Sequence, residues 1–220
     1  MIDLAAHRQW VHNSGMSVLL IALIAAVFAI PAFMPSGETR QLVAEILMSL
    51  ILISGVVAVA EHRKTALALA AISAIVLALG VFQLSAPAAR VPEIRDVIAL
   101  GAFLVLAFAV GINVFASGRA VGDRVFGAVV LYLLLGLLWA VAYHVVARLV
   151  PGAFLGHPAD AVDLSDWVYF SFVTLTTVGY GDITPFAQGA RSLAILEALT
   201  GQLYPAVIIA RLVSLQASKT

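Results

Sequence analysis

Charge and cysteine are both scarce in this chain. Only 11% of its 220 residues are charged, none is a cysteine, and 63% are hydrophobic. A soluble domain of this size lacks the interior to hide so much apolar surface, so the composition indicates an integral membrane protein. The absence of cysteine excludes disulfides, thiol chemistry and cysteine metal sites. The formal net charge of zero removes the electrostatic basis for binding nucleic acid.

Residue patterns that support catalysis are missing as well. No apolar segment carries paired carboxylates, no two histidines have the spacing of metal ligands, and no nucleophilic serine motif lies beside a histidine. These absences predict that the chain is not an intramembrane enzyme and that it uses no cofactor.

Long apolar stretches occupy most of the chain, and six of them can be counted as membrane spans. In lipid a backbone must satisfy its own hydrogen bonds, so each stretch is predicted to be a helix of about 20 residues. The stretches are residues 9–37, 46–60 with a start near residue 42, 65–89, 97–118, 125–147 and 192–210. A shorter apolar run at residues 164–176 cannot span and is predicted to be a re-entrant helix surrounded by protein. The expected fold class is all-α integral membrane.

The basic residues are distributed unevenly between the predicted loops. If the six helices alternate in direction, seven of the twelve lysines and arginines fall on one side. They are Arg8, Arg63, Lys64, Arg119, Arg124, Arg211 and Lys219. Cytoplasmic loops carry an excess of basic residues, so both termini are predicted to lie in the cytoplasm. The loop that holds the re-entrant helix is then outside.

Residues 177–181 read T-V-G-Y-G, a pattern with a physical use in a narrow pore. A potassium ion that enters such a pore loses its water shell, and backbone carbonyls that point the same way can replace it. Gly179 and Gly181 tolerate the unusual dihedral angles that this requires. Val178 and Tyr180 would point away and brace the loop, while Thr177 would add a ring of hydroxyl oxygens. One chain supplies one strand, so a closed pore needs four chains. The alternative is a tight turn between two apolar helices.

The stretch resembles the signature of tetrameric potassium channels, and the resemblance covers about the last hundred residues. It implies a homotetramer that conducts potassium ions passively and selectively across a plasma or inner cell membrane, with lipid and identical subunits as partners. The expected domains are a four-helix domain at residues 1–118 and a pore domain at 119–220. Within the pore domain we expect an outer helix at 122–148, a pore helix at 164–176, a filter at 177–181 and an inner helix at 190–215.

The resemblance also assigns roles to residues around the filter. The expected filter supports are Trp167, Tyr169, Phe170 and Thr176. Asp182 takes the place of an aspartate at the outer mouth. The family often has a tryptophan pair at the positions of Tyr169 and Phe170, and Phe170 cannot donate a hydrogen bond to the Tyr180 hydroxyl. Some members pair the mouth aspartate with a glutamate where this chain has Val173, so Asp182 is expected to find another partner or to stay hydrated.

A gating hinge is expected in the inner helix. Gly201 lies twenty residues beyond Gly181, where many members of the family carry a hinge glycine. Pro205 removes a backbone hydrogen bond and kinks a helix. A bend there would open or close the cytoplasmic mouth, and the alternative is a static kink. Replacing either residue by alanine is predicted to change open probability without changing ion preference.

Glu197 is the one acid within the last apolar stretch. Carboxylates inside a membrane are costly and usually face protein or water. The functional interpretation is a proton or gating sensor behind the filter. The structural alternatives, which we favour, are a partnership with His144 or Arg191, or a protonated acid.

Three further acids lie on the outer approach to the pore, namely Asp160, Asp163 and Asp166. Carboxylates there would raise the local concentration of cations. The alternative is that Asp163 or Ser165 merely caps the pore helix.

The fourth apolar stretch lacks what a voltage sensor needs. Residues 97–118 contain no Arg, Lys, Asp or Glu, so this helix has no charge on which the membrane field can act. The channel is therefore predicted not to be strongly voltage-gated, and its first four helices would be a collar or a receptor. The other functions considered are a less selective cation channel and a silent or modulatory subunit, and the complete T-V-G-Y-G argues against both.

Overall fold

The computed structural model describes residues 16–29, 33, 38–58, 63–85, 91–115, 121–156 and 164–217. Most of them are helical, as expected of an apolar chain in lipid. The first helix is Met16–Ala29, and it ends in the π-helical segment η1 (Ala25–Ala29). The other helices are α3 (Glu38–Ala58), α4 (Arg63–Ser85), α5 (Val91–Phe115), α6 (Val121–Leu149), α7 (Leu164–Leu175) and α8 (Gln188–Ala217). Two short strands, β1 (Phe154–Leu155) and β2 (Thr184–Pro185), pair antiparallel.

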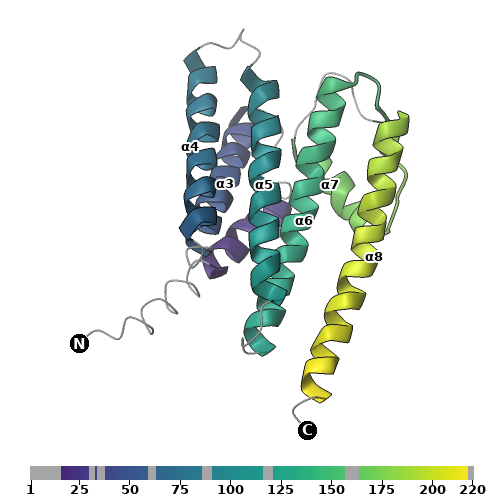
Figure 1. The fold of residues 1–220 in the computed structure, drawn as a ribbon. Helices are drawn as coiled ribbons and strands as arrows, with labels where there is room; N and C mark the ends of the chain where they lie inside the picture. The colour runs from purple at the N-terminus through teal and green to yellow at the C-terminus, as the bar shows by residue number, and fades with distance from the viewer. Residues whose placement is uncertain are drawn as a thin grey trace, which may run out of the picture.

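The helices form two groups that meet along α5 and α6. Figure 1 shows α3, α4 and α5 on one side and α6, α7 and α8 on the other. Phe103 and Leu106 of α5 and Leu134 of α6 are almost wholly buried. Gly55 lets α3 approach α5 closely, because a Cβ there would lie 2.5 Å from Cδ1 of Leu106.

Three of these helices are long and apolar enough to cross a membrane, by length and composition. They are Ile94–Phe115, Gly122–Leu149 and Gln188–Ser214. Shorter apolar segments are Met16–Ala29, Ile46–Val57 and Ala66–Val76. The described helices therefore fit a multi-pass membrane protein, while the count of six spans stays a prediction.

A cluster of charged side chains fixes the start of α5 against the end of α6. The carboxylate of Asp96 is buried and accepts a hydrogen bond from Arg95 at 3.3 Å. Its Oδ2 atom lies 3.3 Å from Nε2 of His144 and 3.5 Å from Nη1 of Arg148. Buried charges are tolerated when they are paired, and these pairings join the two groups of helices at their upper end in Figure 1.

The short helix α7 lies between α6 and α8 and does not cross the molecule (Figure 1). Its Trp167 ring lies 4.7 Å from the Phe154 ring of β1, and its Phe170 ring lies 4.8 Å from the Tyr143 ring of α6. These buried aromatic contacts explain why an apolar helix of 12 residues is held inside the protein rather than across lipid. The helices α6, α7 and α8 begin and end within two residues of the predicted outer, pore and inner helices.

Candidate functional site: the pore loop

The chain reverses direction at the end of α7 and returns as an irregular strand beside α8 (Figure 1). Three backbone hydrogen bonds tie this strand to the last turn of α7. The N–H of Thr177 donates to the carbonyl of Thr174 at 3.0 Å. The N–H groups of Val178 and Gly179 donate to the carbonyl of Val173 at 2.9 and 3.3 Å. The position of the strand is therefore set by the position of α7.

Every second residue of the strand has a positive φ. The values are 60° at Thr177, 59° at Gly179 and 78° at Gly181. In an ordinary extended strand successive carbonyls point in opposite directions, and reversing φ at alternate residues allows them to point to one side. Glycine adopts such angles without steric cost, whereas a threonine must be held there by its surroundings.

The carbonyl oxygens of this strand are available to a ligand. Among the described residues, no backbone N–H donates to the carbonyls of residues 177–180. The side chains of the strand are also open in a single chain, with Val178 52% and Tyr180 72% exposed. A row of oxygens without protein donors can coordinate a dehydrated cation.

Tyr169 of α7 holds the outer end of the strand. Its hydroxyl donates a 2.7 Å hydrogen bond to Asp182, and its ring is parallel to that of Tyr180 with centroids 6.5 Å apart. This hydrogen bond holds the pKa of the Asp182 carboxyl below its usual range and raises the pKa of Tyr169 to about 12. Asp182 therefore has a hydrogen-bond partner other than a glutamate, which was one of the two arrangements expected from the sequence.

The side chains of the other expected supports make contacts elsewhere. Trp167 and Phe170 face the aromatic cluster with Phe154, and so they act on the loop through the placement of α7. The hydroxyl of Thr176 donates to the carbonyl of Phe172 in its own helix at 2.6 Å. The side chain of Tyr169 thus contacts Tyr180 and Asp182 directly.

The inner helix α8 touches the base of the strand at two successive residues. A Cβ on Gly201 would lie 1.8 Å from the carbonyl oxygen of Leu175, the last residue of α7. The next residue, Gln202, donates from Nε2 to the hydroxyl of Thr177 at 3.1 Å. Sequence reasoning identified Gly201 as a hinge but missed Gln202, because its partner lies 25 residues away in the sequence.

Pro205 lies inside α8, and the residue before it is anchored. The Tyr204 hydroxyl donates to the carbonyl of Ala128 on α6 at 2.8 Å, and the Tyr204 ring stacks on Tyr132 at 5.9 Å. A proline leaves the carbonyl four residues earlier without its helical partner, and here that carbonyl belongs to Gly201. The proline that interrupts the helical hydrogen bonds of α8 therefore directly follows a residue that is anchored to α6.

Glu197 has partners other than those expected from the sequence. His144 pairs with Asp96, and the Nε of Arg191 donates to the carbonyl of Pro185. The predicted partnership of Glu197 with His144 or Arg191 is therefore wrong. Glu197 is bound instead by the hydroxyl groups of Tyr143 and Ser171.

The three acids of the outer approach are only partly covered by the structure. Asp166 lies in the first turn of α7 and is half-buried. Asp160 and Asp163 lie outside the described residues.

Comparison with known proteins places this loop in a wider context. A family described as "Ion channel" matches residues 125–216, the segment that contains α6, the loop and α8. Protein LctB of Bacillus caldotenax is 37% identical over 107 residues, which are 46% of this chain and 79% of that protein. The chain belongs to the potassium channel family with a pore-loop module. It is accordingly a transmembrane channel protein and not an enzyme.

Two further relatives match shorter parts of this channel chain. Two pore potassium channel c of Oryza sativa subsp. japonica is 33% identical over 38% of the chain, and the match spans 18% of that protein. Inward rectifier potassium channel Kirbac3.1 of Paramagnetospirillum magnetotacticum is 38% identical over 35% of the chain and 24% of its own length. No solved structure gives a significant match.

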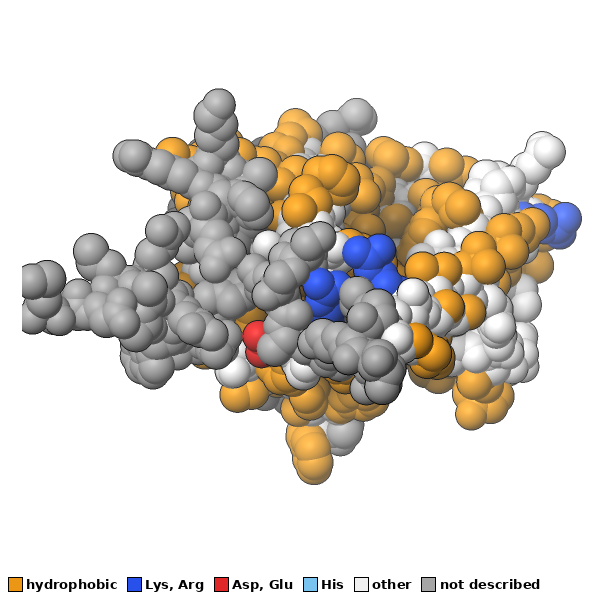
Figure 2. Space-filling model, turned by 60° about the horizontal axis from the view of Figure 1, so that its bottom comes forward, with side chains coloured by type: hydrophobic (Ala, Val, Ile, Leu, Met, Phe, Trp, Pro, Cys, Tyr) orange, Lys and Arg blue, Asp and Glu red, His pale blue; other side chains and the backbone are white. Residues whose placement is uncertain are grey.

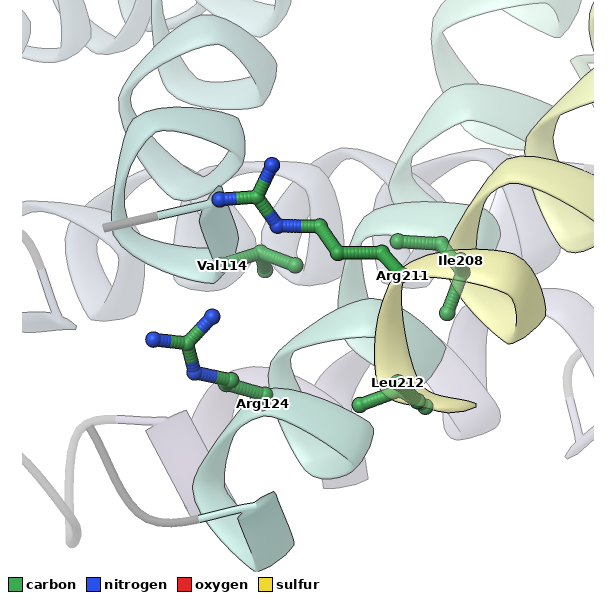
Figure 3. A pocket seen from close by; sticks show the side chains of 5 residues that line it. All are labelled: Val114, Arg124, Ile208, Arg211 and Leu212. Carbon is green, nitrogen blue, oxygen red and sulfur yellow. The ribbon is translucent and has the colours of Figure 1, made fainter. Parts of the chain in front are cut away.

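The end of the channel chain opposite the loop is basic. Figure 2 shows Lys and Arg side chains next to each other at this end, with an acidic side chain nearby. Figure 3 shows Arg124 of α6 and Arg211 of α8 in a pocket that also includes Val114, Ile208 and Leu212. Arg211 donates to the carbonyl of Phe115 at 2.8 Å, and its guanidinium carbon lies 5.2 Å from the Phe115 ring centre. The end of α8 is thus bound to the end of α5.

Proposed function

We propose that this protein is a potassium-selective channel whose filter is formed by residues 177–181. The observation that carries the proposal is the alternation of positive φ at Thr177, Gly179 and Gly181, together with carbonyls that have no backbone donor among the described residues. The carbonyls of residues 177–180 replace the water shell of a potassium ion, and the Thr177 hydroxyl adds oxygens at the inner end. Tyr169 and Asp182 brace the outer mouth.

The channel acts as a homotetramer with a central pore. Irregular backbone at membrane depth is tolerated only where protein or a water-filled cavity surrounds it. The loop of a single chain is exposed. In the apolar segment of α8 that could span a membrane only 11% is buried, whereas the corresponding segments of α5 and α6 are 44% and 56% buried. Gln202 is a polar side chain on an exposed face of α8, which favours a water-filled cavity under the filter. Three further chains around the same axis cover the exposed loop and the exposed face of α8.

The basic end of the molecule lies in the cytoplasm and the filter end lies outside. Arg124 and Arg211 lie near the end of α8, and cytoplasmic ends of spans are enriched in basic residues. Gating by voltage is weak, because the described part of α5 from residue 97 to its end carries no charged side chain. The hinge for opening lies at Gly201 and Pro205.

The test is the reversal potential of the purified protein in planar bilayers with potassium on one side and sodium on the other. The wild type is expected to reverse close to the potassium equilibrium potential. Gly179→Ala is expected to abolish selectivity, because alanine is strained at a φ of 59°. Equal permeability in the wild type would indicate a less selective cation channel, and a correctly assembled tetramer without current would indicate a modulatory subunit. Mass measurement in detergent tests the tetramer.

A further inference from the structure

Glu197 of α8 is fully shielded from solvent and lies at the centre of a buried hydrogen-bonded cluster. Its Oε2 atom lies 2.5 Å from the hydroxyl of Tyr143 on α6, and its Oε1 atom lies 2.5 Å from Oγ of Ser171 on α7. Oγ of Ser171 also lies 2.7 Å from the carbonyl oxygen of Gly136 on α6. The cluster therefore joins the outer, pore and inner helices at one point.

The three contacts are all satisfied in only one protonation state of Glu197. A serine or tyrosine hydroxyl has one proton to donate, and an ionised carboxylate has none. With an ionised Glu197, Ser171 faces two acceptors and has a proton for one of them. With a protonated Glu197, Tyr143 donates to Oε2, Oε1 donates its proton to Ser171, and Ser171 donates to Gly136. Every contact then contains one proton.

The surroundings of Glu197 also favour the uncharged acid. The titratable groups that face it are Tyr143 and Tyr132, both on α6, and the group in contact from α7 is the Ser171 hydroxyl. The salt bridges between described residues do not include Glu197. A buried carboxylate without a cationic partner is costly, whereas a hydrogen-bonded neutral acid is not.

The helices α6 and α7 approach closely at the same place. A Cβ on Gly136 of α6 would lie 2.4 Å from the ring of Phe172 on α7, so the Phe172 ring occupies the space that a larger side chain would need. The neighbouring residue Ser171 uses the Gly136 carbonyl as its acceptor. Small rotations of α7 about its axis would therefore break the Ser171 contacts.

We infer that Glu197 is a neutral carboxylic acid that positions the pore helix against its two neighbours, an inference that rests on the proposed function of the filter. Ser171 lies two residues before Val173, whose carbonyl holds the N–H groups of Val178 and Gly179. A displacement of α7 at Ser171 is thus passed directly to the strand that carries the carbonyls. The hydrogen bonds of Glu197 with Tyr143 and Ser171 go to α6 and α7 and not to the strand, so it acts as a positioning residue.

Glu197→Gln and Glu197→Leu separate this role from that of a buried charge. The glutamine amide can donate to Ser171 and accept from Tyr143, so this variant is expected to keep the selectivity and melting temperature of the wild type. Leucine has a similar volume but neither group, and it is expected to lower the melting temperature by several degrees and reduce the preference for potassium. If glutamine behaves like leucine, a charge is required and the inference is wrong.

Ser171→Ala removes the middle link of the same chain of hydrogen bonds. It is expected to shift selectivity and melting temperature in the direction of Glu197→Leu. The matched control is Ser192→Ala, because the exposed Ser192 hydroxyl donates to the carbonyl of Gln188 in its own helix. A Ser171→Ala channel that matches this control in both measurements would contradict the positioning role.

Infrared spectroscopy of the reconstituted protein reads the protonation state without relying on conduction. The difference spectrum between wild type and Glu197→Gln is expected to contain the C=O stretch of a protonated carboxylic acid. Raising the pH is expected to remove this band together with selective current in the wild type, and to leave the current of Glu197→Gln unchanged over the same range. A selective wild type without the band overturns this inference, whereas a non-selective wild type with the band overturns the proposed function alone.

Discussion

Gly201 combines two properties that have opposite effects on stability. Alanine is more stable than glycine inside a helix by about 1 kcal/mol, so the helix alone would gain from a Gly201→Ala change. The contact with α7 works against it, since a Cβ would lie 1.8 Å from the backbone oxygen of Leu175. Backbone cannot rotate aside as a side chain can, and overpacking of this kind costs about 1–3 kcal/mol. The contact therefore decides the sign.

Gly201→Ala is expected to lower the melting temperature and to change both opening and ion preference. The sequence alone predicted a change in opening only, and the contact with the end of the pore helix is the reason why a change in ion preference is now expected as well. Reversal potentials and thermal unfolding of the purified channel measure the effect. The control is Gly189→Ala on the same helix, where a Cβ meets no atom within 4 Å. Wild-type selectivity in Gly201→Ala would contradict the close contact.

Tyr169→Phe is expected to make the outer mouth more sensitive to acid. The hydrogen bond from Tyr169 lowers the pKa of Asp182 from its ordinary 3.8, so the bonded carboxylate is present at neutral pH and is lost only as the pH falls through the lowered value. Without the phenol the pKa of Asp182 moves upward, and the acid-induced change in current should begin at a higher pH. A series of current recordings at decreasing external pH measures this shift.

The matched control for this change is Tyr204→Phe, because the Tyr204 hydroxyl bonds to the carbonyl of Ala128 on α6 and not to Asp182. Its acid profile should coincide with that of the wild type. If Tyr169→Phe also coincides with the wild type, the hydrogen bond does not hold Asp182 in the assembled channel.

At the scale of the element, α8 divides into a fixed upper part and a freer lower part. Glu197, Gln202 and Tyr204 each bond to another element before the proline. After the proline, the side-chain hydrogen bond to another element among the described residues is that of Arg211. A bend at Pro205 would therefore move the lower half and leave the half beside the filter in place.

Pro205→Ala is expected to alter open probability while the reversal potential stays unchanged. Proline inside a helix is less favourable than alanine by about 3 kcal/mol, so alanine restores the bond to the Gly201 carbonyl and favours the straight helix. Single-channel recording gives both quantities from one preparation. A shifted reversal potential with unchanged opening would place the flexible point elsewhere.

Much of the pore region could be predicted from the sequence because its constraints are local. The letters T-V-G-Y-G predicted the positions that need positive φ at Gly179 and Gly181, and apolar runs between charges predicted α6, α7 and α8. The positive φ of Thr177 was not predicted, since threonine has no intrinsic preference for it. The bonds from Gln202 to Thr177 and from Tyr143 to Glu197 depend on how three helices pack, which no spacing along the chain encodes.

For the whole molecule, the absence of charge in most of α5 is expected to determine the response to voltage. Each elementary charge that crosses the membrane field contributes about 2.3 kcal/mol per 100 mV, and steep gating needs several per subunit. Arg95 and Asp96 lie near the start of α5, where Asp96 is bound to His144 and Arg148. Charges fixed to the outer helix cannot move through the field independently of the pore.

Conductance is therefore expected to vary only weakly with voltage, without the steep sigmoidal curve of sensor-driven channels. Tail currents from reconstituted protein over a wide voltage range measure the slope. Weak rectification remains compatible with this expectation, because ions in the filter themselves feel the field. A slope equivalent to several elementary charges per channel would contradict it.

The cluster around Glu197 also constrains the order in which a newly made chain can mature. Ribosomes release α6 and α7 before α8, so the hydroxyls of Tyr143 and Ser171 enter the bilayer before the carboxyl group that binds them both exists. Until α8 arrives, the pore helix lacks the bond that joins it to the inner helix. The ion pathway is consequently expected to form late in biogenesis, because the pore helix is fixed in place only after the last helix has been inserted.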